Sequence, residues 1–156
     1  MLHATAFALT AAVLLGSITS VSGADGLITK PSRYAAAETL DRLEAALKER
    51  GFMIFARLDH AAAAESFGLT MPKSTVLVFG NPRLGTPVFI QHPTLAIDLP
   101  LKALVWDDAS GKTSLSYNSA QYLLGTIYGR HGAPSSAEAI ARIEAALAAA
   151  TDAAVR

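Results

Sequence analysis

A chain of 156 residues with 13 basic and 13 acidic side chains has the length of one ordinary domain and a formal net charge of zero. The charge balance excludes the basic excess that marks general nucleic-acid binders. Because the chain contains no cysteine, disulfides, thiol catalysis, thiolate metal sites and haem attachment through a C-x-x-C-H motif are also excluded.

The first 24 residues have the pattern of a secretory signal peptide. Residues 4–18, ATAFALTAAVLLGSI, are apolar or small, and Ser22 and Ala24 place small side chains at positions −3 and −1 of a cleavage site before Asp25. The apolar run is shorter than the roughly 20 residues that cross a bilayer, so an uncleaved anchor is only the alternative. We therefore expect a periplasmic or secreted protein, with residues 25–156 as one domain and no membrane anchor after cleavage.

The next part of the chain predicts a strand, a helix and a second strand. GLITK, residues 26–30, has the composition of a short strand, and Ser32 is expected to cap the helix that follows. Gly51 ends that helix, and FMIFARLD, residues 52–59, predicts the second strand. The helix has one apolar stripe, formed by Leu40, Leu43 and Leu47.

An Ala-rich helix and a central strand follow. Asp59 is placed to cap HAAAAESFGL, which ends at Gly68. STVLVFG, residues 74–80, is apolar and rich in β-branched residues, which predicts a strand buried on both faces.

The stretch after that strand, GNPRLGTPVFIQHP, holds the densest group of special residues. Its G-x-x-x-x-G spacing is that of a phosphate loop, but Thr-Pro follows where such a loop needs Lys and Ser or Thr, so nucleotide binding is excluded. We interpret Asn81-Pro82 as a turn and Thr86 as the N-cap of a short helix that begins at Pro87. The N-terminus of that helix, with Arg83 nearby, is a candidate anion site.

The second half of the chain predicts a hairpin and two helices. A strand over 101–106, the turn DDASGK and a strand over 113–118 form the hairpin. A helix over 120–128 ends at Gly129, and a capping box of Ser135 and Glu138 opens a last helix, 135–150, with a frayed Ala-rich end. The fold class is α+β: one mostly antiparallel or mixed sheet, packed by helices in two layers.

Five stretches, in this order, resemble a bacterial family called domain of unknown function 302: LKERGF, LDH, LVFGNPRLGTP, IDLPLKALVWDD and GKTSLSYNS. The resemblance covers roughly Leu27 to Tyr128, the family-like core. It implies a compact α+β domain that often forms a homodimer, and it implies no established activity. Some relatives carry cysteines where this chain has Gly80 and Leu101, so any thiol or soft-metal chemistry of theirs is not carried over.

The residues with catalytic or metal-binding chemistry form no known motif. His60, His92 and His131 are too far apart in sequence for a local metal motif, and no G-x-S-x-G elbow is present. Asp107 and Asp108 have the setting of a hairpin turn rather than of a catalytic pair.

We therefore expect an exported, non-catalytic domain that binds a small ligand or anion, or a protein partner, and forms a homodimer, without a cofactor. Two alternatives stay open: a periplasmic enzyme that uses His60 or His92 for acid–base chemistry, and a metal or haem-iron binder through the histidines. The candidate ligand-binding residues are Asn81, Arg83, Thr86 and His92, with His60 and Asp98 as neighbours from adjacent segments.

Overall fold

The computed structural model describes Val21, Ser22 and residues 26–156. The predicted signal peptide and its cleavage site lie outside these residues, except for Val21 and Ser22, which form a short strand. Within the described ranges, no helix is both long enough and apolar enough to cross a membrane.

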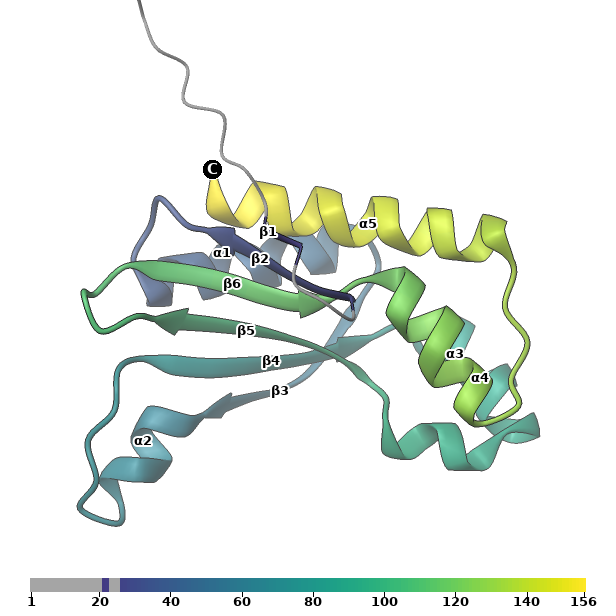
Figure 1. The fold of residues 1–156 in the computed structure, drawn as a ribbon, viewed down its shortest axis with the longest axis horizontal. Helices are drawn as coiled ribbons and strands as arrows, with labels where there is room; N and C mark the ends of the chain where they lie inside the picture. The colour runs from purple at the N-terminus through teal and green to yellow at the C-terminus, as the bar shows by residue number, and fades with distance from the viewer. Residues whose placement is uncertain (1–20, 23–25) are drawn as a thin grey trace, which may run out of the picture.

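One antiparallel sheet forms the centre of the molecule, with its strands in the order β1-β2-β6-β5-β4-β3 (Figure 1). This confirms the α+β class and makes the sheet wholly antiparallel. The strands are β1 (Val21–Ser22), β2 (Leu27–Pro31), β3 (Met53–Asp59), β4 (Ser74–Gly80), β5 (Leu101–Asp107) and β6 (Thr113–Asn118).

Two long helices lie side by side on one face of this sheet and make the second layer (Figure 1). They are α1 (Ala36–Glu49) and α5 (Ala137–Val155). The shorter helical elements are α2 (His60–Glu65), α3 (Pro82–Gln91), the 3-10 turn η2 (Pro93–Ile97), the π-helical segment η3 (Gln121–Ile127) and α4 (Tyr128–Arg130).

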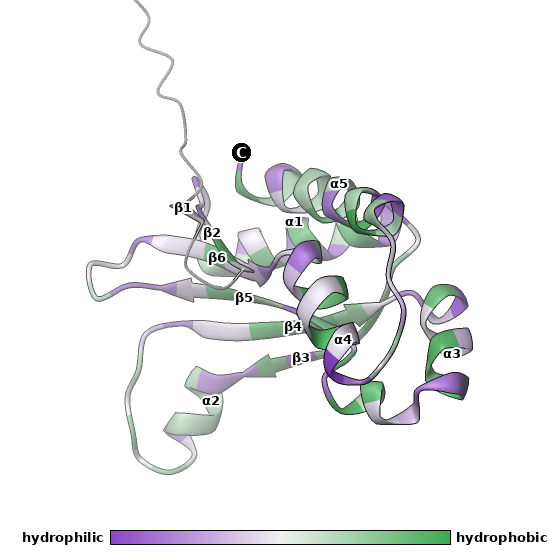
Figure 2. Cartoon of the chain, turned by 45° about the vertical axis from the view of Figure 1, so that its right-hand side comes forward, coloured by the Kyte–Doolittle hydropathy of each residue, from purple (hydrophilic) through white to green (hydrophobic). Residues whose placement is uncertain are grey.

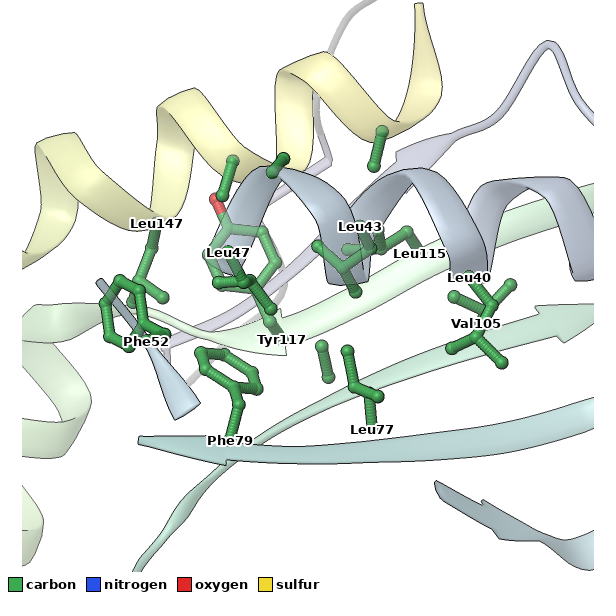
Figure 3. Close-up of a cluster of buried hydrophobic side chains, with 14 of the residues drawn as sticks. Leu40, Leu43, Leu47, Phe52, Leu77, Phe79, Val105, Leu115, Tyr117 and Leu147 are labelled. Atoms are coloured by element: carbon green, nitrogen blue, oxygen red, sulfur yellow. The ribbon is translucent and has the colours of Figure 1, made fainter. Parts of the chain in front are cut away.

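The core lies between the sheet and these two helices (Figure 3). The predicted stripe of α1 is confirmed, because Leu43 and Leu47 are completely buried. Phe52 and Phe79 meet edge to face beside them, with ring centroids 5.5 Å apart. Such burial of large apolar side chains is the main stabilising term of a domain of this size.

The C-terminal part of α5 is firmly packed, so the predicted fraying of its Ala-rich end is wrong. Ala150, Ala154 and Val155 are buried against the rest of the core. The small alanine side chains let α5 approach α1 closely. Ala150 and Ala154 are thus part of a tight contact between the two helices.

A buried lysine joins α5 to the sheet. Lys30, on β2, donates from Nζ to Thr151 Oγ1 at 2.7 Å and to Asp152 Oδ1 at 2.8 Å. Its Nζ also lies 5.5 Å from the centre of the Tyr117 ring. The charge is therefore paired where it leaves water, as a buried ammonium requires.

Several helix ends differ from the sequence prediction. Helix α1 begins after Ala35 and not at Ser32, whose hydroxyl is used in a turn, where it accepts from Tyr34 N and contacts Thr39 Oγ1. The capping residue of α5 is Ser136, one position after Ser135. Helix α4 continues through the predicted stop at Gly129, and the chain turns at Gly132, which has a φ of +67°.

The prediction that β4 is buried on both faces is also wrong. Leu77 and Phe79 face α1 and α5 and are buried, whereas Val76 and Val78 point to the opposite face and are only half-buried. Apolar composition alone does not distinguish a strand covered on both faces from one in a sheet that carries its helices on one face.

Candidate ligand-binding cleft

An open cleft of about 540 Å³ lies where the end of the sheet meets α3, η3 and the first turns of α5. Figure 2 shows α3 beyond the end of the sheet, with hydrophobic and hydrophilic stretches along it. The side chains on the cleft wall are mainly apolar and include four aromatic rings, those of Phe52, Phe55, Phe89 and Tyr128.

The α3 wall is built by the stretch GNPRLGTPVFIQHP. Asn81 caps α3, because its side-chain oxygen accepts from Arg83 N at 3.0 Å, and Pro82 follows at N1. The helix therefore begins five residues before the predicted start at Pro87, and Thr86 lies inside it and is not its N-cap. The predicted turn is instead the first turn of a helix.

One side of α3 faces the cleft. Leu84 and Val88 are four residues apart, as are Gly85 and Phe89. All four residues therefore lie on the same side of the helix and line the same wall. No residue of α3 is buried. The apolar side of this helix therefore contributes to the cleft rather than to the core.

A bulge in β3 directs a fourth aromatic side chain into the cleft. The pairing with β4 shifts between Ile54 and Ala56, which leaves Phe55 as the extra residue. A side chain at Gly80 would bring its Cβ to 3.2 Å from Phe55 Cε2 and 3.5 Å from Pro100 Cβ. Glycine at this position lets the Phe55 ring lie against the end of β4 while half of its surface stays exposed, 49%.

The opposite wall comes from η3, α4 and α5. Burial raises the pKa of Tyr128, so its phenol stays protonated and is a neutral hydrogen-bond donor. Ala139, Arg142 and Ile143 line the cleft from one side of α5. Among the described residues that line the cleft, Arg142 is the only charged one.

A polar cluster lies outside the cleft, between η2 and the end of α4. His131 Nε2 donates to Asp98 Oδ2 at 2.6 Å, and His131 Nδ1 lies 3.0 Å from Thr94 Oγ1. The hydrogen bond from His131, and then the charge of Arg130, lower the pKa of Asp98. The order Thr–His–Asp is that of a nucleophilic triad, but neither Thr94 nor His131 lines the cleft.

The structure separates the six predicted site residues. Asn81 and Thr86 line the cleft, and Arg83 is exposed beside them on α3 without lining it. The other three lie elsewhere. His92 is the C-cap residue of α3, His60 begins α2 at the other end of the sheet, and Asp98 pairs with His131 (Figure 1).

The metal-binding alternative requires His60, His92 and His131 to converge, and the structure places His60 on α2, at the other end of the sheet from His92. Within residues 21–22 and 26–156, no group of three or more His, Asp or Glu side chains is placed to hold a metal ion. Sequence reasoning missed Arg142 and Phe55 as cleft residues. The only local signal is that Arg142 stands next to the apolar Ile143 in the last predicted helix, while no sequence pattern indicates the bulge that exposes Phe55.

Comparisons with known proteins point to one family. A family model described as domain of unknown function DUF302 matches residues 28–150. The crystal structure of an uncharacterized conserved protein DUF302 from Bacillus stearothermophilus is similar, with a TM-score of 0.70 and 26% identity over 84% of this chain and 98% of that chain.

Curated relatives share a shorter region. Fluoride-specific ion channel FluC 1 of Brucella suis biovar 1 (strain 1330) is 42% identical over 98 residues, which are 63% of this chain and 39% of that protein. Its namesake from Brucella abortus biovar 1 (strain 9-941) has the same identity over 36% of its own length. The chain thus spans less than two fifths of the curated relatives that it matches.

Proposed function

We propose that this chain, which belongs to the family described as domain of unknown function DUF302, is a non-catalytic domain that binds a small, largely apolar ligand in the cleft beside α3. The observation that carries the proposal is the cleft itself. Its volume of about 540 Å³ falls within the range of small-molecule sites. Its aromatic and aliphatic wall, with a few hydroxyl and amide groups, has the composition of such sites.

The exposure of the wall supports a binding role. Leu84 and Phe55 are each 49% exposed, although burial of a Leu or Phe side chain contributes about 1.5–3 kcal/mol. A domain selected only for stability would place such side chains in its core. The free protein instead keeps them at the cleft, where a ligand recovers that burial.

The chemistry of the lining residues supports binding rather than turnover. The described residues that line the cleft include no histidine, aspartate or glutamate, so the usual acid–base groups are missing from its wall. His60 and His92, the residues of the enzyme alternative, lie outside it. The names of the two relatives describe a fluoride channel, but this chain matches less than two fifths of each relative, so the proposal does not extend that activity to it.

A cavity-filling substitution tests the proposal. Gly85 is helical and lines the cleft, and a Cβ there would meet the Phe89 ring at an ordinary 3.6 Å. We expect Gly85→Leu to abolish the binding of the dye 1-anilinonaphthalene-8-sulfonate, measured by fluorescence titration. Stability should hold or rise, because glycine inside a helix costs about 1 kcal/mol relative to alanine.

The matched control is Gly129→Leu. Gly129 is also helical and would meet nothing within 4 Å, but it does not line the cleft. Dye binding should survive this change. If Gly85→Leu binds the dye as tightly as the unchanged protein, the cleft is not the binding site.

A second candidate is a protein partner, specifically a second copy of this chain on the uncovered face of the sheet. On that face Leu58 is 50% exposed and pairs with the half-buried Val76, and Met53 is 52% exposed on the same edge strand. Exposed apolar patches of this kind favour association. Light scattering should give a dimer mass that Leu58→Glu reduces to that of a monomer.

The pattern of the first 24 residues supports export as a further part of the proposal. Mass spectrometry of the protein purified from a periplasmic or culture fraction should find a mature N-terminus near Asp25. An intact Met1 in that protein would contradict cleavage.

A further inference from the structure

The charge on the cleft wall indicates that the ligand has an anionic group as well as an apolar part. Of the 21 described residues that line it, Arg142 is the only charged one, so this part of the chain gives the wall one cation and no carboxylate. A guanidinium next to an apolar surface attracts an anion more strongly than it does in bulk water, because the local dielectric constant is lower.

Arg142 is free to act on a ligand. Within the described residues it takes part in no ion pair, whereas Arg57, Arg130 and Lys30 are paired with carboxylates. Its side chain is exposed at the edge of the cleft. The position therefore suits a charged group that stays in contact with water while the rest of the ligand is buried.

The polar groups around the wall fit a carboxylate as well. Ser135 and Tyr128 line the same cleft, and each carries a hydroxyl group that can donate a hydrogen bond. Burial keeps Tyr128 protonated, so the phenol does not repel an anion. The remaining wall, formed by residues such as Leu84, Val88 and Phe89 of α3, matches a hydrocarbon tail.

We propose that the cleft takes an anionic amphiphile, a medium-chain carboxylate whose head group binds Arg142 and whose tail lies along α3. This inference rests on the proposed function and adds the class of ligand. An arginine binds a carboxylate through two parallel hydrogen bonds, which gives specificity that an apolar wall alone cannot supply.

The test compares ligands that share a tail but differ in the head group. Displacement of the fluorescent dye is measured with octanoate, decanoate and dodecanoate, and with decanol and decylamine, below their micelle concentrations. We expect decanoate to bind better than decanol and decylamine. Each added CH₂ should tighten binding about fourfold until the cleft is full.

Substitutions locate the head group. Arg142→Gln should weaken decanoate about tenfold to a hundredfold, the range of a charged hydrogen bond, and leave decanol unchanged. Arg142→Lys should retain part of the preference. Arg33→Gln is the charge-matched control, because Arg33 is exposed and does not line the cleft, and it should change neither ligand.

The outcomes separate the inference from the proposed function. Equal binding of decanoate and decanol, or a loss of the preference in Arg83→Gln but not in Arg142→Gln, overturns the assignment to Arg142. If Gly85→Leu still abolishes binding in that case, the ligand cleft stands. If none of these amphiphiles binds, and the dye does not bind, the inference and the cleft both fail.

Discussion

The helix-covered face of the sheet and the cleft at its end use the same kinds of residue in opposite ways. Leu43 and Leu47 of α1 are completely buried in the core between this helix and the sheet, whereas Leu84 of α3 and Phe55 are half exposed at the cleft. The difference does not come from the residue types but from whether the side chains are enclosed between two packed layers. The packed face provides the stability of the domain, and the cleft leaves apolar surface for a ligand.

The strongest test of this contrast removes the same side chain in each region. Leu47→Ala should lower the free energy of unfolding by about 2–5 kcal/mol, because it leaves a cavity in a closely packed core. Leu84→Ala should cost only about 0.5 kcal/mol, as exposed substitutions do. Urea unfolding, followed by circular dichroism, measures both. Similar losses would mean that the cleft wall is part of the core.

A smaller effect is expected from the buried lysine that joins α5 to the packed face of the sheet. Lys30→Met keeps the aliphatic stem but removes the bonds to Thr151 and Asp152. We expect a loss of about 1–2 kcal/mol in urea unfolding, since Asp152 is partly exposed and regains water. Ligand binding should not change. Unchanged stability would show that packing alone holds α5 on the sheet.

The smallest effect concerns the polar cluster near the cleft end. The hydrogen bond from His131 and the charge of Arg130 lower the pKa of Asp98. Its contribution to stability is therefore complete above the unfolded-state value near 3.8 and disappears as the pH falls through the folded-state pKa.

Thermal unfolding across pH measures this contribution. Asp98→Asn should be less stable than the unchanged protein above about pH 4, and the two curves should converge in stronger acid. A carboxyl titration by NMR should place Asp98 below its usual pKa. A difference that stays constant down to the most acid pH would assign the effect to packing rather than to the charge.

The sequence predicts the packed face of the sheet well. The spacing of Leu40, Leu43 and Leu47 reports a helix with one buried side, and the β-branched run of β4 gives its limits correctly, from Ser74 to Gly80. The resemblance to domain of unknown function 302 is confirmed, and the match extends beyond the predicted core into α5. Local spacing works here because each element buries one regular side.

The cleft end is less predictable, because tertiary contacts decide it. The stretch around Asn81 forms one wall of the cleft, but the start of α3 depends on whether Asn81 or Thr86 caps the helix. The bulge at Phe55 requires the partner strand to be known. The pairing of Asp98 with His131 joins residues 33 positions apart, which no local pattern reports.

The π-helical segment η3 makes the cleft sensitive to the number of residues as well as to their identity. A π turn holds one residue more than an α turn. Deletion of one residue from Gln121–Ile127 that restored an α-helix would turn the following residues by about 100° about the helix axis. Tyr128 would then leave the wall that it now shares with Leu124. A change of one residue in the length of this segment would thus reshape the cleft while the core side chains of α1 and of the sheet stay the same.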